Sequence, residues 1–174
     1  GYCSRRQAEK LILQNKVYIN GKACRHPSQK VSDHDIVRVN KEILKMINEI
    51  KLWKMYKPVK YISSTKDNLK RKKIYDLLPK GMPKVISIGR LDYMSEGLIL
   101  FTNKGEYSRY LELPSSNIER TYRVCVEGNV KETYIQKINK GISIKKINYN
   151  KVKLNIEKVD GKNIWLIFRL REGK

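Results

Sequence analysis

The sequence predicts an α+β fold with a mixed, largely antiparallel sheet. Short apolar or alternating runs, which are typical of strands, dominate the chain, and helical patterns fall between them. Near the end of the chain, residues 152–159 and 164–170 flank Asp160-Gly161, a pair that favours a tight hairpin turn. No apolar run approaches the roughly 20 residues that a membrane-spanning helix needs.

A helix is predicted at the start of the chain. Ser4-Arg5-Arg6-Gln7 has the spacing of a capping box, in which two side chains bond each other's backbone N–H groups. Ala8, Leu11 and Ile12 then recur on one helical face. Nothing precedes this helix for it to pack on, so we expect the module that it opens to lack a first helix and the chain to be cut at this end.

Strands complete a small module over residues 1–40. Residues 17–19 lead into Asn20-Gly21, a strong signal for a hairpin turn, and residues 35–39 predict a further strand. A helix and a small sheet with dense positive charge suit a module that grips folded RNA by its phosphates; a merely solvated basic face is the alternative. The basic residues include Arg5, Arg6, Lys10, Lys16, Lys22, Arg25 and Lys30.

Residues 41–52 predict a linker to a larger domain over residues 53–174. A short docking helix is the alternative, because four apolar residues of this segment have helical spacing. These are Ile43, Met46, Ile47 and Ile50.

The larger domain predicts strands separated by short helices. The first strand ends at Lys57-Pro58, because proline cannot donate to a ladder. Residues 66–73 include five basic residues and predict a mobile basic loop. The other predicted elements are strands at 53–56, 61–62, 85–88, 98–101 and 121–126, and helices at 74–78, 107–113 and 131–140.

The chain is strongly basic. Its 174 residues carry 38 Lys and Arg against 17 Asp and Glu, a formal net charge of +21. Such a surface attracts a polyanion, and nucleic acid is the leading candidate. An AT-rich genome that favours Lys codons is the alternative explanation. Such a genome would also favour Glu, but acidic residues are far fewer than basic ones here.

Cysteine and histidine usage argues against several kinds of chemistry. Cys3, Cys24 and Cys125 are scattered and form no C-x-x-C pair, which disfavours a disulfide scaffold and a zinc knuckle and fits a reducing compartment. His26 and His34 have no partner at ligand spacing, so neither a metal site nor a Ser-His-Asp triad is expected.

Residues 89–106 hold the strongest candidate for chemistry. Asp92 follows Arg90 between two apolar runs, a pattern that predicts a strand, a tight turn and a strand, with an acid and a guanidinium at the turn. Turns between rigid strands often present catalytic groups, and a carboxylate beside a cation stays ionised and nucleophilic at neutral pH. The alternative is that Asp92 caps the turn and Arg90 is a solvated charge.

Tyr122 and the end of the chain supply further candidates. Tyr122 begins a predicted strand between Arg120 and Arg123. A tyrosine there can stack on a base and exchange a proton, and an ordinary strand tyrosine is the alternative. Residues 169–174 place basic groups, Lys174 among them, at the end of the last predicted strand.

These motifs together resemble those of the RsuA/RluB/RluE/RluF-type RNA pseudouridine synthases. The catalytic motif of that family is similar to Gly89-Arg90-Leu91-Asp92. It continues here with Ser95, Gly97, Thr102-Asn103 and Gly105-Glu106. Lys57-Pro58 resembles its Lys-Pro turn, residues 120–124 its tyrosine motif, and Glu172-Gly173-Lys174 the beginning of its third, basic motif. Residues 1–40 resemble the S4-type RNA-binding module that these enzymes carry in front. The resemblance covers nearly the whole chain, in order.

The resemblance implies the pseudouridine synthase fold and a reaction without cofactor or metal. Asp92 would be the nucleophile that detaches uracil from its ribose and permits reattachment through carbon. Tyr122 would stack on the flipped uracil and take part in proton transfer, and Lys174 would pair with Asp92 and hold it ionised. Arg90 would help fill the gap left by the flipped nucleotide. Contacts to RNA are also expected from Lys57, Arg5, Arg6, Lys10 and Lys22.

The chain departs from the family pattern at two positions. Ser95 replaces the usual threonine and keeps the hydroxyl, whereas Lys60 replaces the usual glycine after Lys-Pro-x, so we expect that turn to differ. The family also continues past the equivalent of Lys174 with a basic helix and closing strands. We therefore expect the chain to be cut at this end as well.

The expected function is site-specific isomerisation of uridine to pseudouridine in ribosomal RNA. Large-subunit (23S) RNA is favoured, because residues 110–115 are closer to members of that type. The alternatives are a synthase for small-subunit ribosomal RNA or tRNA, and a non-catalytic RNA-binding or ribosome-assembly protein. We expect a monomer, without membrane or metal, in the cytoplasm of a bacterium or in an organelle of bacterial origin.

Overall fold

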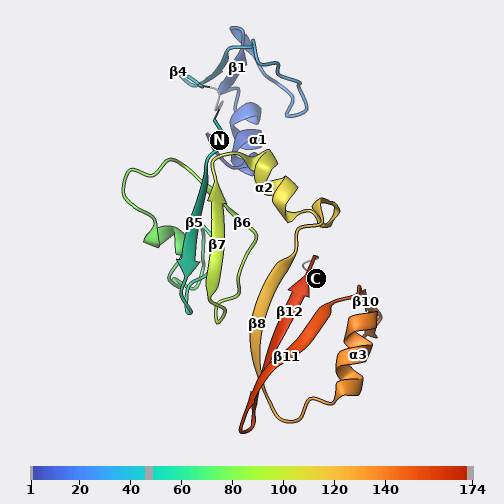
Figure 1. The fold of residues 1–174 in the computed structure, drawn as a ribbon. Helices are drawn as coiled ribbons and strands as arrows, with labels where there is room; N and C mark the ends of the chain where they lie inside the picture. Colours follow the sequence, from blue (N-terminus) through green and yellow to red (C-terminus); the bar gives the residue numbers. More distant parts are fainter. Residues whose placement is uncertain (1, 46–48, 172–174) are drawn as a thin grey trace. The chain divides into compact units, whose positions relative to one another are not determined.

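The computed structural model describes residues 2–45 and 49–171 (Figure 1). The chain divides into two compact units, residues 1–109 and 110–174. Within the described ranges, every helix is too short or too polar to cross a membrane.

The first unit begins with a helix and four short strands. Ser4 caps α1 (Arg5–Leu13): its hydroxyl accepts the Gln7 N–H at 3.3 Å, and the Gln7 side chain accepts the Ser4 N–H at 3.1 Å. The predicted capping box is confirmed. The strands form an antiparallel sheet in the order β2-β1-β3-β4. Their bounds are β1 Val17–Ile19, β2 Lys22–Ala23, β3 Val37–Val39 and β4 Glu42–Ile43.

Asn20 fixes two connections of this small sheet. With φ of 49° and 81°, Asn20 and Gly21 form the predicted turn between β1 and β2. The Asn20 side chain donates to Asp35 at 2.7 Å and accepts the Ile36 N–H at 2.9 Å. Because Asp35 also accepts the Ser32 N–H at 2.7 Å, it belongs to a turn, and the strand predicted from residue 35 begins only at Val37.

The segment predicted as a linker contributes a strand to this sheet. β4 lies within residues 41–52 and pairs with β3. The alternative docking helix centres on residues 46–48, which lie outside the described residues. The described neighbours, residues 41–45 and 49–52, are not helical.

A second sheet of the first unit carries the loop with Asp92. Its antiparallel order is β5-β7-β6, and its register pairs Trp53 with Phe101 and Met55 with Ile99. Tyr75, on the 3₁₀ helix η1, packs edge-on against Phe101 with ring centroids 5.6 Å apart. The bounds are β5 Leu52–Lys57, η1 Ile74–Leu77, β6 Ile86–Ile88 and β7 Gly97–Thr102, and the buried core consists of Ile74, Val85, Ile99 and Phe101.

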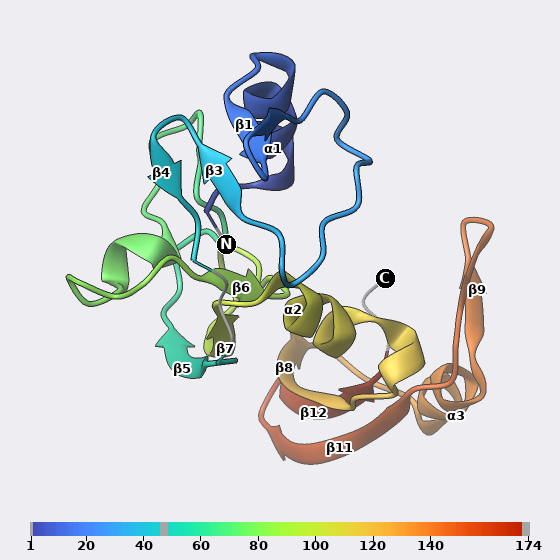
Figure 2. The ribbon, with the colours of Figure 1, turned by 90° about the horizontal axis from the view of Figure 1, so that it is seen from above.

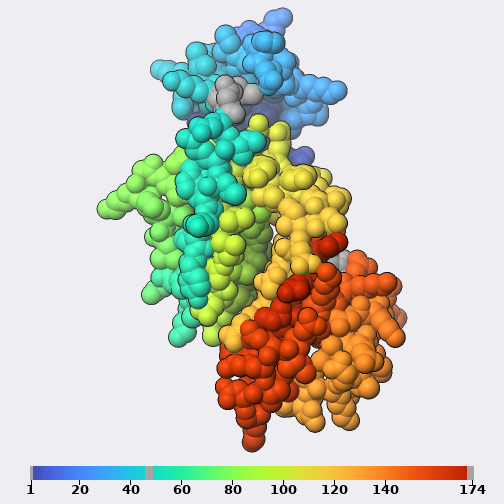
Figure 3. Space-filling model, in the orientation of Figure 1, coloured from blue at the N-terminus to red at the C-terminus, as the bar shows by residue number. Residues whose placement is uncertain are grey.

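The second unit is a three-stranded antiparallel sheet, in the order β11-β12-β8, packed against α3. Its core joins Ile135 of α3 to Leu154, Ile164 and Leu166 of the sheet. The predicted long hairpin is confirmed, and its turn protrudes at one end of the unit (Figure 3). α2 (Gly105–Glu112) includes the boundary between the two units. The bounds of the other elements are η2 Pro114–Ser116, β8 Arg120–Glu127, α3 Glu132–Lys140, β11 Lys153–Asp160 and β12 Asn163–Leu170.

One hairpin was not predicted. β9 (Ile142–Ile144) and β10 (Ile147–Tyr149) pair directly after α3, where the sequence shows no glycine or asparagine at the turn. Every strand pair in the described ranges is antiparallel, and the parallel component is an isolated bridge between Ile62 and Lys73. The α+β class with a largely antiparallel arrangement is confirmed.

Candidate active site

Asp92 lies on the loop that joins β6 to β7. This loop runs over residues 89–96 and is longer than the tight turn predicted there. The Asp92 side chain is exposed, whereas its backbone carbonyl accepts the Ser95 N–H at 3.1 Å. The structure therefore presents a carboxylate at the surface on a loop whose backbone is internally bonded.

The buried side chain of Lys57 hydrogen-bonds to the backbone of this loop. Its side chain is 0% exposed, and its ammonium donates to the carbonyl oxygens of Asp92 at 2.9 Å, Ser95 at 2.6 Å and Pro58 at 3.1 Å. These three bonds use all three N–H groups of the ammonium. Because no part of the side chain reaches the surface, the expected contact between Lys57 and RNA is not supported. Lys57 instead positions the backbone that carries Asp92.

The charge of Lys57 is balanced locally. Burial lowers the pKa of the Lys57 ammonium, and the nearby carboxylates of Asp92 and Glu96 oppose this shift. Glu96 also hydrogen-bonds to the Tyr56 hydroxyl, which raises the pKa of Tyr56. The ammonium thus places a buried positive charge close to the exposed carboxylate.

The turn that follows β5 forms a second set of bonds to the loop. The Ser63 hydroxyl donates to the Leu91 carbonyl at 2.9 Å and accepts the Leu91 N–H at 3.1 Å, and the Lys60 N–H donates to the Tyr93 carbonyl at 2.7 Å. Lys60 has φ of 65°, the left-handed conformation that favours glycine. This position therefore has a glycine-like conformation, although a lysine occupies it.

The basic loop over residues 66–73 also reaches the Asp92 loop. The Arg71 guanidinium lies 6.0 Å from the centre of the Tyr93 ring and bonds Asp67 at 2.6 Å. The Arg71 side chain and its backbone N–H together hold the pKa of Asp67 at about 2. Residues on both sides of Asp92 are therefore bonded to the segment between β5 and η1.

Arg90 belongs to the same loop as Asp92. Its side chain is exposed, and within the described ranges it makes no ion pair or hydrogen bond. The structure thus brings Asp92, Arg90 and Lys57 together in one loop assembly of the first unit.

Tyr122 lies in the second unit, on β8. The register places it opposite Phe168 of β12, and 36% of its surface is exposed. The two arginines beside it serve the fold: Arg120 bonds the Leu111 carbonyl of α2 at 2.9 Å, and Arg123 bonds Glu157 at 2.6 Å. The predicted role of Tyr122 toward a base stays a prediction.

The remaining predicted site residues lie apart from the Asp92 loop in the chain. Lys174 lies outside the described residues, so its pairing with Asp92 stays a prediction. In the N-terminal module, Arg5 pairs with Glu9 at 3.2 Å. The side chains predicted to bind RNA are all exposed there: Arg5, Arg6, Lys10 and Lys22.

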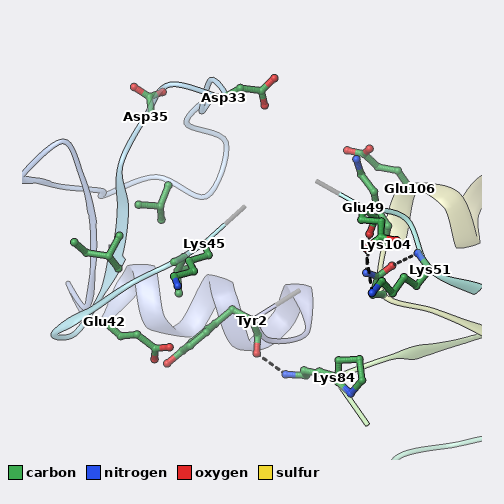
Figure 4. A pocket seen from close by; sticks show the side chains of 16 residues that line it. Tyr2, Asp33, Asp35, Glu42, Lys45, Glu49, Lys51, Lys84, Lys104 and Glu106 are labelled. Carbon is green, nitrogen blue, oxygen red and sulfur yellow. Dashed lines mark hydrogen bonds and ion pairs between the residues drawn. The ribbon is translucent and has the colours of Figure 1, made fainter. Parts of the chain in front are cut away.

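A hollow of the first unit has a different character (Figure 4). Both acidic and basic side chains line it, and Lys84 donates to the Tyr2 carbonyl at 2.5 Å. It contains none of the predicted catalytic residues. Among residues 2–45 and 49–171, no group of three or more His, Cys, Asp and Glu could hold a metal ion.

Comparison with known proteins identifies the family. The family model described as RNA pseudouridylate synthase matches residues 51–173, which include the whole Asp92 assembly. The chain belongs to the RNA pseudouridylate synthase family. The S4 domain model matches residues 1–37, which confirms the N-terminal resemblance. The predicted enzyme class, an isomerase acting on RNA, is confirmed by this membership.

Relatives of the pseudouridylate synthase family match along the whole chain. A protein of Rickettsia conorii (strain ATCC VR-613 / Malish 7), described as an uncharacterized RNA pseudouridine synthase, is 41% identical over all of this chain and 75% of its own length. The ribosomal large subunit pseudouridine synthase B of Bacillus subtilis (strain 168) is 34% identical over all of this chain and 72% of its own. A pseudouridylate synthase crystal structure, 30% identical, covers 98% of this chain and 73% of that one with a TM-score of 0.64.

The pseudouridylate synthase motifs did not reveal every residue of the assembly. Ser63 and Arg71 contact the Asp92 loop at Leu91 and Tyr93, yet nothing in the sequence links Ser63 to Leu91, 28 positions away. A signal for Lys57 did exist, because strand alternation puts it on the same face as Trp53 and Met55.

Proposed function

We propose that this pseudouridine synthase converts a specific uridine of large-subunit ribosomal RNA into pseudouridine, with Asp92 as the nucleophile. The observation that carries the proposal is the exposed Asp92 carboxylate on a loop whose backbone Lys57 and Ser63 hold in place. A nucleophile held in a fixed position loses little entropy on reaching the reactive geometry. The relatives named ribosomal large subunit pseudouridine synthase B, 34% and 35% identical, support the choice of RNA.

The reaction is an isomerisation and needs no oxidant or reductant. The bond between N1 of uracil and C1′ of ribose breaks, a bond between C5 and C1′ forms, and the hydrogen on C5 is released as N1 gains a proton. We assign to Tyr122 stacking on the flipped base and proton transfer, and to Lys174 the pairing that keeps Asp92 ionised. Arg90, exposed on the Asp92 loop, would occupy the gap in the RNA stack.

The residues assigned to this reaction all come from one chain. We propose that the protein acts as a monomer in the cytoplasm of a bacterium, or in an organelle of bacterial origin. Phosphate contacts from the S4 module, including Arg5, Arg6, Lys10 and Lys22, would select the RNA region. Small-subunit ribosomal RNA and tRNA are the competing substrates.

Tritium release tests the role of Asp92. Ribosomal RNA labelled with tritium on C5 of uracil should lose tritium to water with the wild-type protein, because C5 gives up its hydrogen. We expect Asp92→Asn to reduce release to background while RNA affinity is kept, since the amide has nearly the same shape but is not nucleophilic. Asp33→Asn, an exposed acid elsewhere in the first unit, is the matched control.

The outcomes separate the candidate functions. Undiminished release with Asp92→Asn would remove Asp92 from the chemistry. RNA binding without release from the wild-type protein would instead support a non-catalytic RNA-binding protein. Mapping of pseudouridines in large-subunit, small-subunit and transfer RNA of a strain lacking the gene then identifies the substrate by the site that is lost.

A further inference from the structure

The β9–β10 hairpin and its surroundings in the second unit concentrate positive charge on residues that have no assigned part in the reaction. Residues 133–156 contain no Asp or Glu. Lys153 is paired with Glu119 at 3.8 Å, whereas the other lysines of this stretch make no ion pair within the described part of the chain. All are exposed: Lys137, Lys140, Lys145, Lys146, Lys151 and Lys153. Apart from Lys153, these lysines have no acidic partner among residues 2–45 and 49–171.

The tip of the hairpin holds two of these lysines in an unfavourable backbone conformation. Lys145 and Lys146 have φ of 49° and 66°, the pair of left-handed conformations that Asn-Gly adopts most readily. The same chain does use Asn20-Gly21 at the equivalent turn of its first hairpin. Two adjacent lysines at such a turn lower stability, and they put two charged residues at the turn between β9 and β10.

The base of the hairpin is fixed to the unit. The Asn139 side chain, near the end of α3, donates to the Leu154 carbonyl at 3.1 Å and accepts the Leu154 N–H at 2.7 Å. Gly141 joins α3 to β9 with φ of 97°, and a Cβ there would lie 3.1 Å from the Tyr149 carbonyl. Figure 2 shows the hairpin projecting from the end of α3. The lysines at the tip are thus carried on a firmly anchored arm.

The two faces of the hairpin differ. Ile144 and Ile147 form a cross-strand pair near the tip and are 49% and 50% exposed. The opposite face carries Ser143 and Asn148, which also pair. An apolar patch beside unpaired ammonium groups suits a partner that offers both phosphates and the flat surfaces of riboses and bases.

We infer that residues 137–153, which we call the lysine arm, form a second RNA-binding element that contacts phosphates of the substrate other than that of the target uridine. The inference rests on the proposed function for its choice of RNA as the polyanion. The arm raises the affinity of the protein for RNA, because each phosphate that it neutralises releases a counterion.

A double substitution at the tip tests the lysine arm without harming the fold. Lys145→Asn with Lys146→Gly removes two charges and supplies the residues that this turn favours, so thermal stability should hold or rise. The probe is unmodified 23S RNA transcribed in vitro, titrated at several salt concentrations. We expect affinity to fall about 10-fold near 0.1 M salt and the slope of log K against log salt to shrink by about 1.5, at about 0.7–0.9 per lost phosphate contact.

A matched control separates the lysine arm from total charge. Lys158→Gln with Lys162→Gln also removes two charges, at the β11–β12 turn at the other end of β11, where Asp160 already pairs with Lys158 at 3.6 Å. This variant should keep nearly the wild-type affinity for RNA and nearly the wild-type slope of log K against log salt. Equal losses in both variants, or no loss in the arm variant, would overturn the inference.

Two further measurements distinguish failure of this inference from failure of the proposed function. If the arm variant loses affinity for polyglutamate and not for RNA, the arm is a surface for an acidic protein and the inference is wrong. Tritium release by the wild-type protein is measured on the same RNA. If the wild-type protein releases no tritium but the arm variant still loses RNA affinity as expected, the proposed reaction is wrong and the lysine arm is still supported as an RNA-binding element.

Discussion

Lys57 is a charged residue in a position that the strand pattern assigns to the core. It follows Trp53 and Met55 on the inner face of β5, and its ammonium ends among three carbonyl oxygens instead of apolar atoms. The motif identified Lys57 as important, but its full burial does not support the expected contact with RNA, which stays a prediction. Strand alternation was the better guide to its role.

Removal of the Lys57 ammonium should destabilise the fold and slow the reaction. Lys57→Met keeps the length of the side chain but removes three hydrogen bonds to buried carbonyls, so we expect the free energy of unfolding in urea to fall by about 2–4 kcal/mol. Displacement of the Asp92 backbone should also reduce tritium release about 10²-fold at temperatures where the variant is folded.

Lys54→Met is the control for this prediction. Lys54 lies on the same strand with its side chain on the exposed face, so its replacement should change stability by less than about 0.5 kcal/mol. If Lys57→Met matches this control in stability and in tritium release, Lys57 does not position the loop.

At the scale of elements, the loop over residues 66–73 is organised by one ion pair. Asp67 accepts the Arg71 backbone N–H at 2.7 Å as well as its guanidinium, and only 7% of the Asp67 side chain is exposed. Arg71 extends in turn to Tyr93, next to Asp92. Composition indicates only a basic segment here, because it does not show which acid closes the loop.

This ion pair predicts a loss of stability in acid. The pKa of Asp67 is about 2 in the folded protein and 3.8 ordinarily, so the folded state favours the ionised form. Its contribution is complete above about pH 3.8 and is lost as pH falls through about 2, because the unfolded chain then binds the proton first. Urea unfolding over this pH range should therefore show a smaller pH dependence for Asp67→Asn than for the wild-type protein.

Asp33→Asn supplies the comparison, since it removes an exposed carboxylate of the same unit. A carbon-detected titration of the Asp67 carboxyl by NMR gives the pKa directly. A midpoint near 3.8 for Asp67, or identical pH profiles for the two variants, would contradict the prediction.

Most elements were predictable because their ends carry specific residues. The capping box at Ser4, Gly141 after α3 and Asp160-Gly161 before β12 each mark a boundary that the structure keeps. The β9–β10 hairpin was missed for the opposite reason: lysines occupy a turn that normally contains Asn and Gly. Asp35 was assigned to a strand because its bonds to Asn20 and Ser32 are not visible in the sequence.

At the scale of the whole molecule, domain organisation was partly readable from the sequence. The family models cover residues 1–37 and 51–173, whereas the compact units meet between residues 109 and 110. The division into residues 1–40, 41–52 and 53–174 is therefore a proposal about evolutionary modules. A composition shift does not reveal that β5, β6 and β7 group with the N-terminal module by contact, because that grouping depends on long-range pairing.

The net charge of +21 predicts strongly salt-dependent RNA binding. If six or more phosphates are neutralised, affinity for 23S RNA should fall about 10³-fold between roughly 50 and 200 mM salt. Fluorescence anisotropy at several salt concentrations measures this, with thermal unfolding over the same range to show that the protein remains folded. A flat response would mean that charge does not govern capture of the RNA.

The buried ammonium of Lys57 also has a consequence for how β5 finds its partner. In the native alignment Lys57 lies opposite Gly97, at the end of β7 where the Asp92 loop closes. A slip by one residue would turn Lys57 to the other face and separate its ammonium from the carbonyls that it bonds. Apolar side chains alone tolerate such slips more readily than a cation that needs three specific acceptors. Lys57 thus couples correct strand alignment to assembly of the Asp92 loop, so a misaligned chain would lose both stability and the loop conformation that the proposed reaction needs.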